Sequence, residues 1–262
     1  MKSLDTLLNQ TIKITEKAAL LIDDLRKNFD FSKIEYKGKN DLVSFVDKQA
    51  ELFLVESLGK IFPEAGFIAE EGTGVPKKIN WVIDPLDGTT NFMHGLPPYS
   101  ISIGLMDGEE LILGVILEIT SRTCYYAHKE GKAYCDGEVI RVSNVRNFSD
   151  GLYITGYPYR DFSKMKNFNQ LMYHFLANSH GLRRFGSAAV DLAYVACGKS
   201  EGFFEFFLNP WDVAAGALIV QRAGGIVTDF KGGNNFIYGK ELIAAAAVHP
   251  EMQKIIEACW YE

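Results

Sequence analysis

The sequence lacks the marks of a secreted or membrane-spanning protein. Its 262 residues contain no apolar run approaching the roughly 18 residues that a membrane helix needs. The N-terminal MKSLDTLLNQ includes Asp5 and holds no apolar stretch of the length found in signal peptides. Proline-rich and serine-rich linkers, internal repeats and low-complexity tracts are also absent. We therefore expect a cytoplasmic protein in which residues 1–262 form a single unit.

Motifs typical of several catalytic classes are missing as well. The four cysteines form no CxxC pair and are too few for a disulfide scaffold. The five histidines show neither HxxxH nor HxH spacing, so a histidine zinc site is not indicated. There is no GxSxG motif, and the spacing between Gly233 and Gly239 is too long for a phosphate-binding P-loop. Serine-nucleophile and P-loop chemistry thus have no support.

Positive charge is in short supply. The chain has 27 Lys and Arg against 33 Asp and Glu, which gives a formal net charge of −6. This balance argues against a broad basic surface for nucleic acid and against an anionic membrane as the main partner. Taken alone it also disfavours a phosphate substrate. The apolar share of 47% and the charged share of 23% match an ordinary globular protein with a real core.

The N-terminal half shows two kinds of apolar pattern. Helical periodicity predicts helices over 3–28 and 44–62, with a mobile loop at 37–41 between them. From Gly66 to Ser143, short apolar runs separated by Asp-Gly turns predict an antiparallel sheet. We therefore expect residues 1–146 to form an α+β subdomain.

The C-terminal half alternates between strands and helices. The predicted strands are 151–156, 202–208, 226–230 and 242–248, and the predicted helices are 164–178, 187–197, 211–223 and a last one from Pro250. Alternation of this kind is typical of an α/β layer. We therefore expect residues 147–262 to form an α/β subdomain that shares a core with the first.

The segment WVIDPLDGTTNF, residues 81–92, carries the densest chemistry. An apolar strand ends at Asp84 and Asp87 follows closely, so two carboxylates leave one strand end together. Their repulsion calls for a neutralising partner, and Mg²⁺ prefers such oxygen ligands. Residues 88–91 then form a glycine turn into a helix N-terminus, which attracts anions. The alternative is a purely structural polar turn between a strand and a helix.

Two further acidic positions favour the chemical interpretation. Glu70 and Glu71 end another strand-like segment, FIA, and precede Gly72. Asp212 follows Trp211 at the start of an apolar helix, where it could equally serve as a helix cap worth about 1 kcal/mol. The pattern thus predicts several carboxylates at strand and helix ends, with capping left open for Asp212.

Three separated segments resemble the signatures of the inositol monophosphatase family, which comprises metal-dependent phosphatases of sugar and inositol phosphates. They are AEEG at 69–72, WVIDPLDGTTNF at 81–92 and PWDVAAG at 210–216. KNDLVSFVD and RRFGSAAVDLAYVACG also resemble family segments, so the resemblance covers nearly the whole chain. It implies a mixed α/β (α+β) fold, the layered αβαβα sandwich shared with fructose-1,6-bisphosphatase, and a homodimer.

The resemblance also implies roles for individual residues. Two to three Mg²⁺ ions are expected: the first on Glu70, Asp84 and the carbonyl oxygen of Leu86, the second on Asp84, Asp87 and Asp212, and a weaker third near Glu70 held mainly by water. Attacking water would be metal-bound and oriented by Glu70 and Thr89, with Asp47 paired to Thr89. Substrate contacts are expected for Asp87, Gly88, Thr89, Gly186, Ser187, Ala188, Glu205 and Asp212. Arg183 is a further candidate contact on the residues alone: it and Arg184 precede the predicted helix at 187, and one of the two guanidinium groups could contact substrate or a partner subunit. Two solvated arginines on a turn are an equally good interpretation.

The expected activity is Mg²⁺-dependent hydrolysis of inositol-1-phosphate or a related sugar phosphate, inhibited by Li⁺. The TTNF after DG resembles inositol monophosphatases, whereas 3'-phosphoadenosine phosphatases tend toward KEF there. Fructose-1,6-bisphosphatase activity is the main enzymatic alternative. A second class of function is also open, because bacterial members of the family are associated with transcription and ribosomal RNA processing.

Overall fold

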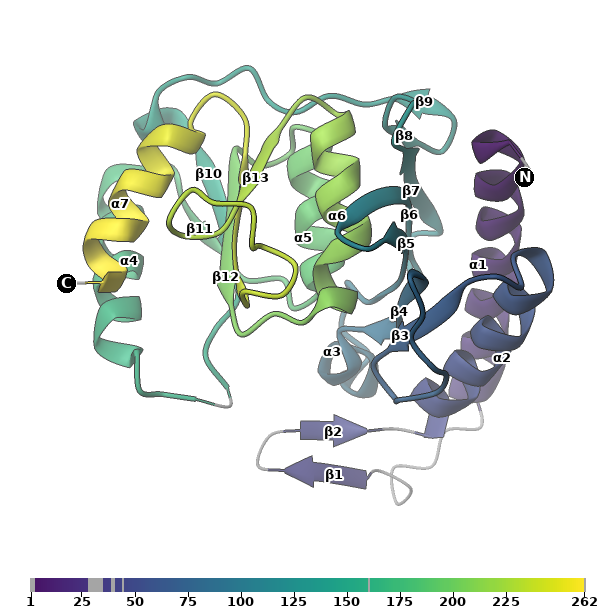
Figure 1. Ribbon diagram of the computed structural model, residues 1–262. Coiled ribbons are helices and arrows are strands. Elements are labelled where there is room, and N and C mark those ends of the chain that lie inside the picture. Colours follow the sequence, from purple (N-terminus) through teal and green to yellow (C-terminus); the bar gives the residue numbers. More distant parts are fainter. Residues whose placement is uncertain (1–2, 28–34, 39–40, 44, 160, 262) are drawn as a thin grey trace.

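The structure, a computed structural model, describes residues 3–27, 35–38, 41–43, 45–159 and 161–261 (Figure 1). The helices are α1 Leu4–Lys27, α2 Phe45–Ile61, α3 Thr89–His94, α4 Met165–Asn178, α5 Ala188–Ala196, α6 Pro210–Arg222 and α7 His249–Tyr261, with a short 3₁₀ turn at Phe148–Asp150. The strands are β1 Glu35–Gly38, β2 Asp41–Val43, β3 Gly66–Ala69, β4 Ile79–Asp87, β5 Ser100–Asp107, β6 Glu110–Glu118, β7 Thr123–His128, β8 Tyr134–Cys135, β9 Glu138–Val139, β10 Leu152–Thr155, β11 Gly181–Arg183, β12 Gly202–Phe206, β13 Ile226–Thr228 and β14 Glu241–Ala245.

Five layers make up the fold, as Figure 1 shows from right to left. Helices α1 and α2 cover one face of a seven-stranded sheet, and α6 packs on its other face. Helix α5 lies beside α6 and contacts the five-stranded sheet, whose far face carries α4 and α7. The predicted αβαβα sandwich is confirmed. The predicted subdomain boundary between residues 146 and 147 stays a prediction.

The seven-stranded sheet runs β3-β4-β5-β6-β7-β8-β9. It is antiparallel except for its first pair, β3 and β4, which run in parallel. The prediction of an antiparallel sheet from Gly66 onward was therefore wrong for this pair. The segment 70–78 crosses back to the start of the sheet, as a parallel pair requires. As a result, the carboxyl ends of both strands lie side by side.

The five-stranded sheet has the order β11-β10-β12-β14-β13 and mixes directions. Strand β10 is parallel to both β11 and β12, whereas β14 is antiparallel to β12 and β13. The three-residue strand β11 was not predicted, because it is too short to show an apolar period. The predicted loop at 37–41 was wrong in part, because Lys37 and Gly38 lie in β1 and Asp41 lies in β2, while 39–40 are outside the described residues.

Glycine lets α6 lie directly on the seven-stranded sheet. A Cβ added to Gly114 of β6 would lie 2.6 Å from the carbonyl oxygen of Ala215 in α6, and one added to Gly104 of β5 would lie 3.1 Å from the Cβ of Ala214. At Gly114 the nearest atoms of the helix are those of the Ala215 backbone, and at Gly104 only the methyl group of Ala214 lies between helix and strand. The helix that begins beside Asp212 is therefore placed by backbone contact.

This close approach predicts a clear loss of stability for Gly114→Ala. The added methyl group meets backbone rather than a movable side chain, and such overpacking costs about 1–3 kcal/mol. The matched control is Gly59→Ala in α2, where the nearest atom is 3.7 Å away and the change should stabilise the protein by about 0.5–1 kcal/mol. Urea unfolding followed by circular dichroism measures both, and equal unfolding free energies for the two variants would contradict the packing argument.

Within the described ranges, the structure contains no helix both long and apolar enough to cross a bilayer.

Candidate active site

A cavity of about 500 Å³ lies between the two halves of the fold. It is lined by Glu70, Asp84, Leu86, Asp87, Gly88, Thr89, Thr90, Gly156, Tyr159, Arg184, Gly186, Ser187, Ala188, Asp191, Glu205, Leu208 and Asp212. The acidic members come from the ends of β3 and β4 and from β12, α5 and α6. The structure thus brings together segments that are far apart in the sequence.

The parallel pair β3 and β4 places the first two carboxylates. The backbone N–H of Glu70 donates to the carbonyl oxygen of Ile83 at 3.2 Å, which holds Glu70 beside the end of β4. Asp84 is 2% exposed, and its Oδ1 accepts a hydrogen bond from the N–H of Leu86 at 2.9 Å. The chain turns tightly here, so Asp84 and the Leu86 carbonyl both belong to the cavity wall.

Asp87 is held by the start of α5. Its Oδ2 accepts hydrogen bonds from Ser187 Oγ at 2.6 Å and from the N–H of Ala189 at 2.8 Å. Ser187 is the N-cap of α5, and its Oγ also lies 3.1 Å from Ser100 Oγ. The implied substrate contact Ser187 therefore fixes the orientation of Asp87.

Asp212 takes part in the capping of α6 and lines the cavity at the same time. Its Oδ2 accepts hydrogen bonds from the N–H of Asn209 at 2.7 Å and from Asn209 Nδ2 at 3.4 Å, and the first of these belongs to a capping box in which Asn209 is the N-cap. Both bonds use the same carboxylate oxygen. The capping role that the sequence left open is present, and it leaves the side chain turned along the cavity wall.

The glycine turn after Asp87 is closely packed. Gly88 has φ of +90°, and a Cβ there would lie 3.0 Å from the carbonyl oxygen of Gly186. The next residue, Thr89, places its Oγ1 3.0 Å from the carbonyl oxygen of Leu86 and 3.5 Å from Asp47 Oδ1. Asp47, on α2, is only 4% exposed. Thr89 and Asp47 thus face each other as predicted, although the bond between their side chains is long at 3.5 Å.

The carboxylates repel one another in this buried setting. Burial and the charge of Asp212 raise the pKa of Glu70 well above its usual range, and burial and Glu70 do the same for Asp84. Burial and Asp87 raise the pKa of Asp212 to about 8. Burial also raises the pKa of Asp87, against hydrogen bonds from Ser187 and the α5 backbone.

An oxygen-only donor set of this kind fits Mg²⁺ in chemistry. Across the described ranges, no three His, Cys, Asp or Glu side chains are already placed to hold a metal ion. The chemistry of the donors fits a divalent cation, because several carboxylates that line one buried cavity repel one another unless positive charge lies beside them.

The far wall of the cavity holds the remaining predicted contacts. Glu205 on β12 lies beside Gly156, where any Cβ would overlap its carboxylate. Burial and Asp87 raise the pKa of Glu205 to about 8. Of the two arginines, Arg184 lines the cavity, whereas Arg183 is exposed on β11 and donates to its own neighbour, the Leu182 carbonyl oxygen, at 3.1 Å.

Two buried acidic residues, one lining the cavity and one behind it, were not predicted from the sequence, and the role of Arg184 was left open. Asp191 lies in the predicted helix 187–197, where an acidic residue among apolar ones was the available signal. Glu51 of α2 is fully buried, and its two oxygens accept hydrogen bonds from the N–H groups of Glu71 at 2.7 Å and Thr73 at 2.8 Å. Glu51 thereby anchors the loop that follows Glu70.

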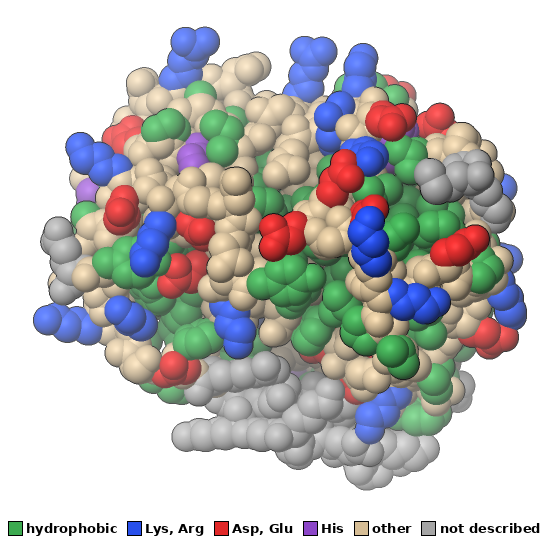
Figure 2. Space-filling model, viewed as in Figure 1, with side chains coloured by type: hydrophobic (Ala, Val, Ile, Leu, Met, Phe, Trp, Pro, Cys, Tyr) green, Lys and Arg blue, Asp and Glu red, His purple; other side chains and the backbone are tan. Residues whose placement is uncertain are grey.

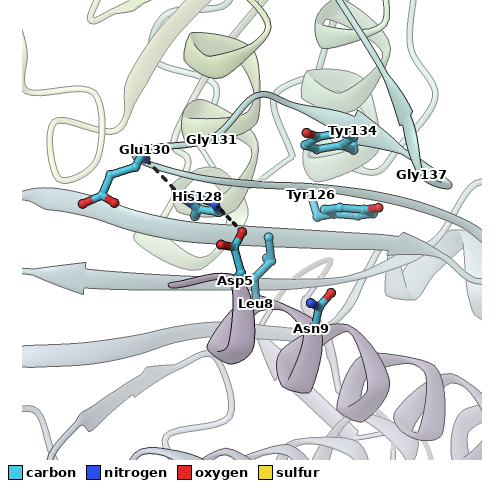
Figure 3. Close-up of a pocket in the computed structure, with 9 residues that line it drawn as sticks. All are labelled: Asp5, Leu8, Asn9, Tyr126, His128, Glu130, Gly131, Tyr134 and Gly137. Carbon is cyan, nitrogen blue, oxygen red and sulfur yellow. Dashed lines mark hydrogen bonds and ion pairs between the residues drawn. The ribbon is translucent and has the colours of Figure 1, made fainter. Parts of the chain in front are cut away.

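A second cavity, of about 420 Å³, lies between the start of α1 and the edge strands β7 to β9 (Figure 3). His128 Nε2 lies 3.0 Å from Asp5 Oδ1, and its Nδ1 accepts the N–H of Glu130 at 3.2 Å. Tyr126 and Tyr134 stack at its other side, with ring centroids 5.5 Å apart. None of the predicted site residues lies there, so the first cavity is the candidate active site.

Comparisons with known proteins identify the family of the chain. A sequence profile of the inositol monophosphatase family matches residues 3–261. The chain is 40% identical over 255 residues to a protein named putative Nus factor SuhB from Neisseria meningitidis serogroup B, with 96% of this chain and 98% of that protein covered.

Two solved structures are close in fold. The extragenic suppressor protein SuhB of Bartonella henselae has a TM-score of 0.90 at 33% identity, with 96% of this chain and 98% of that chain covered. Thermotoga maritima IMPase has a TM-score of 0.88 at 33% identity, with 96% of this chain and 97% of that one covered. With its acidic cavity at the predicted motifs, the chain belongs to the inositol monophosphatase family of phosphatases.

Proposed function

We propose that the chain is a Mg²⁺-dependent phosphomonoesterase that hydrolyses inositol-1-phosphate or a related sugar phosphate. The observation that carries this proposal is the meeting of Glu70, Asp84, Asp87 and Asp212 in one cavity beside the Gly88 turn. Four carboxylates repel a phosphate group, so such a site can bind phosphate only with added positive charge, which divalent cations supply. The acidic net charge of the chain is thus compatible with an anionic substrate.

The proposed ligands are those that the family resemblance implies, and Glu70, Asp84, Leu86, Asp87 and Asp212 all line the cavity. Glu70, Asp84 and the Leu86 carbonyl would hold a first Mg²⁺, Asp84, Asp87 and Asp212 a second, and Glu70 with water a weaker third. When bound, these ions would activate water as the nucleophile and stabilise the leaving oxygen. Thr89, placed by the Leu86 carbonyl and by Asp47, would orient that water together with Glu70.

The substrate would lie between the glycine turn and α5. Backbone N–H groups at Gly88 and Thr89 would hold phosphate oxygens at the start of α3. Gly186, Ala188 and Glu205 would face the hydroxyl groups of the polyol. Ser187 would act mainly through Asp87, because its hydroxyl already donates to that carboxylate.

Phosphate release tests the proposal directly. Purified protein with Mg²⁺ should release phosphate from inositol-1-phosphate, with fructose-1,6-bisphosphate and 3'-phosphoadenosine 5'-phosphate as comparison substrates. Li⁺ at millimolar concentration should inhibit the release. Faster turnover of fructose-1,6-bisphosphate would favour the bisphosphatase alternative, and inertness toward all three substrates would refute the phosphatase proposal.

A second candidate function is a partner role in transcription or RNA processing. The name of the Neisseria meningitidis relative, a putative Nus factor, is the observation that favours it. On the face shown in Figure 2, basic and acidic side chains are interspersed without a broad basic area, which favours a protein partner over nucleic acid. Co-purification of Asp87→Asn with transcription proteins would show that such a role is independent of catalysis.

We also propose that the protein is a cytoplasmic homodimer and that each of its two chains consists of the two predicted subdomains, 1–146 and 147–262. Light scattering of the purified chain measures its mass, and a mass near 29.3 kDa would contradict the dimer.

A further inference from the structure

Asp191 is a buried carboxylate that the proposed mechanism does not use. It lies in the first turn of α5, is 1% exposed and lines the candidate active site. Within the part of the chain that the structure describes, its Oδ1 makes no hydrogen bond. An unpartnered buried oxygen of this kind costs free energy, so its presence calls for an explanation.

Helix capping does not explain it. The N-cap of α5 is Ser187, whose Oγ accepts a hydrogen bond from the N–H of Val190 at 3.3 Å. The N–H of Ala189 is already used by Asp87. The free backbone donors at the start of the helix are therefore served by other side chains, and Asp191 is not needed there.

Ion pairing inside the protein does not explain it either. The charged groups that act on Asp191 are Glu205, Asp87 and Arg184; the two acids raise its pKa, as burial does, and the arginine lowers it. Arg184 is itself exposed, and its guanidinium carbon lies 6.0 Å from the centre of the Tyr157 ring. Among the described residues that line the cavity, two carboxylates, Asp191 and Glu205, thus share its far wall with the exposed Arg184.

We propose that Asp191 is a specificity-determining residue that accepts a hydrogen bond from a hydroxyl group of the polyol part of the substrate. The proposal rests on the proposed phosphatase function. Helix α5 gives it a geometric basis, because one end of its first turn holds Asp87 while Asp191 lies further along the wall beside Glu205. A phosphomonoester with hydroxyl groups away from its phosphate can reach both regions, whereas one without them leaves Oδ1 unpartnered.

Substrate choice separates this role from a general one. Asp191→Asn keeps the size of the side chain and removes its charge. It should lower kcat/KM for inositol-1-phosphate by about 10- to 100-fold, the range for a hydrogen bond to a charged group. For p-nitrophenyl phosphate, which has no hydroxyl groups, the change should stay within about 3-fold. The Mg²⁺ concentration for half-maximal activity should not move.

Binding provides a readout that does not depend on turnover. With Ca²⁺ in place of Mg²⁺, calorimetry should show that Asp191→Asn weakens the binding of inositol-1-phosphate by a similar factor. The affinity for inorganic phosphate should stay the same. Asp150→Asn, at an exposed aspartate outside the cavity, is the matched control and should change neither value. Circular dichroism confirms that each variant is folded.

The outcomes are distinct. Equal losses on both substrates would overturn the specificity role, and so would kinetics that are unchanged on both substrates, whatever the melting temperature of the variant. Either result leaves the phosphatase proposal standing. A wild-type chain that neither hydrolyses nor binds inositol-1-phosphate would overturn both proposals together.

Discussion

Asp87→Asn should lower the rate of phosphate release by about 1,000-fold, equivalent to roughly 4 kcal/mol of transition-state stabilisation. The change removes one negative charge from the proposed second Mg²⁺ site. The amide oxygen of asparagine can still accept the hydrogen bonds from Ser187 and Ala189, so the start of α5 should keep its position. The expected loss is therefore in chemistry and metal affinity, with the fold retained.

Steady-state kinetics over a range of Mg²⁺ concentrations measure this effect. Asp107→Asn is the matched control, because Asp107 lies at the opposite end of β5 from the cavity, paired to Ile79 of β4 and ion-paired with Lys78 at 3.2 Å. It should keep full activity. Undiminished turnover of Asp87→Asn at low Mg²⁺ would show that Asp87 is not a metal ligand.

Mg²⁺ should raise the melting temperature, and by more at pH 8 than at pH 5. With chelator present, the carboxyl groups of the cavity have a raised pKa in the folded state, to about 8 for Glu205 and Asp212. Such groups contribute most stability below their usual pKa near 4, and this contribution is lost as the pH rises toward 8. Bound Mg²⁺ removes that penalty by neutralising the ionised carboxylates.

The size of the shift follows from mass action. Mg²⁺ at 100 times its dissociation constant stabilises the folded state by about 2.7 kcal/mol, which corresponds to a rise of about 5–10 °C for a chain of this length. Scanning fluorimetry at both pH values, with chelator or Mg²⁺ and with NaCl at matched ionic strength, measures it. A shift of equal size at pH 5 and pH 8, or one reproduced by NaCl, would contradict the proposed origin.

The metal motif could be predicted from sequence because it is contiguous. Asp84, Asp87 and the glycine turn lie within one short segment, and strand ends and helix starts bring their groups together locally. Glu70 and Asp212 could be tied to that segment only through the family resemblance. The structure explains why they meet: β3 runs parallel to β4, and α6 begins beside the same sheet end.

Other features could not be predicted, because they depend on contacts between distant segments. Apolar periodicity does not report strand direction, so the parallel pairing of β3 with β4 was missed. Asp191 and Glu51 sit in helices whose buried faces read as apolar, and only the tertiary fold shows what surrounds them. Arg183 and Arg184 are equivalent in sequence, and the course of β11 decides which one lines the cavity.

The central pair of helices has a mechanical consequence. Helix α5 carries Asp191, and Asp212 lies in the first turn of α6. Together the two helices contact both sheets. Opening the cavity by rotating one half of the molecule against the other would shear this layer, where Gly114 and Ala215 leave no room to slide. We therefore expect the proposed substrate to enter, and its product to leave, through movement of the loops around the cavity rather than through rotation of the two halves.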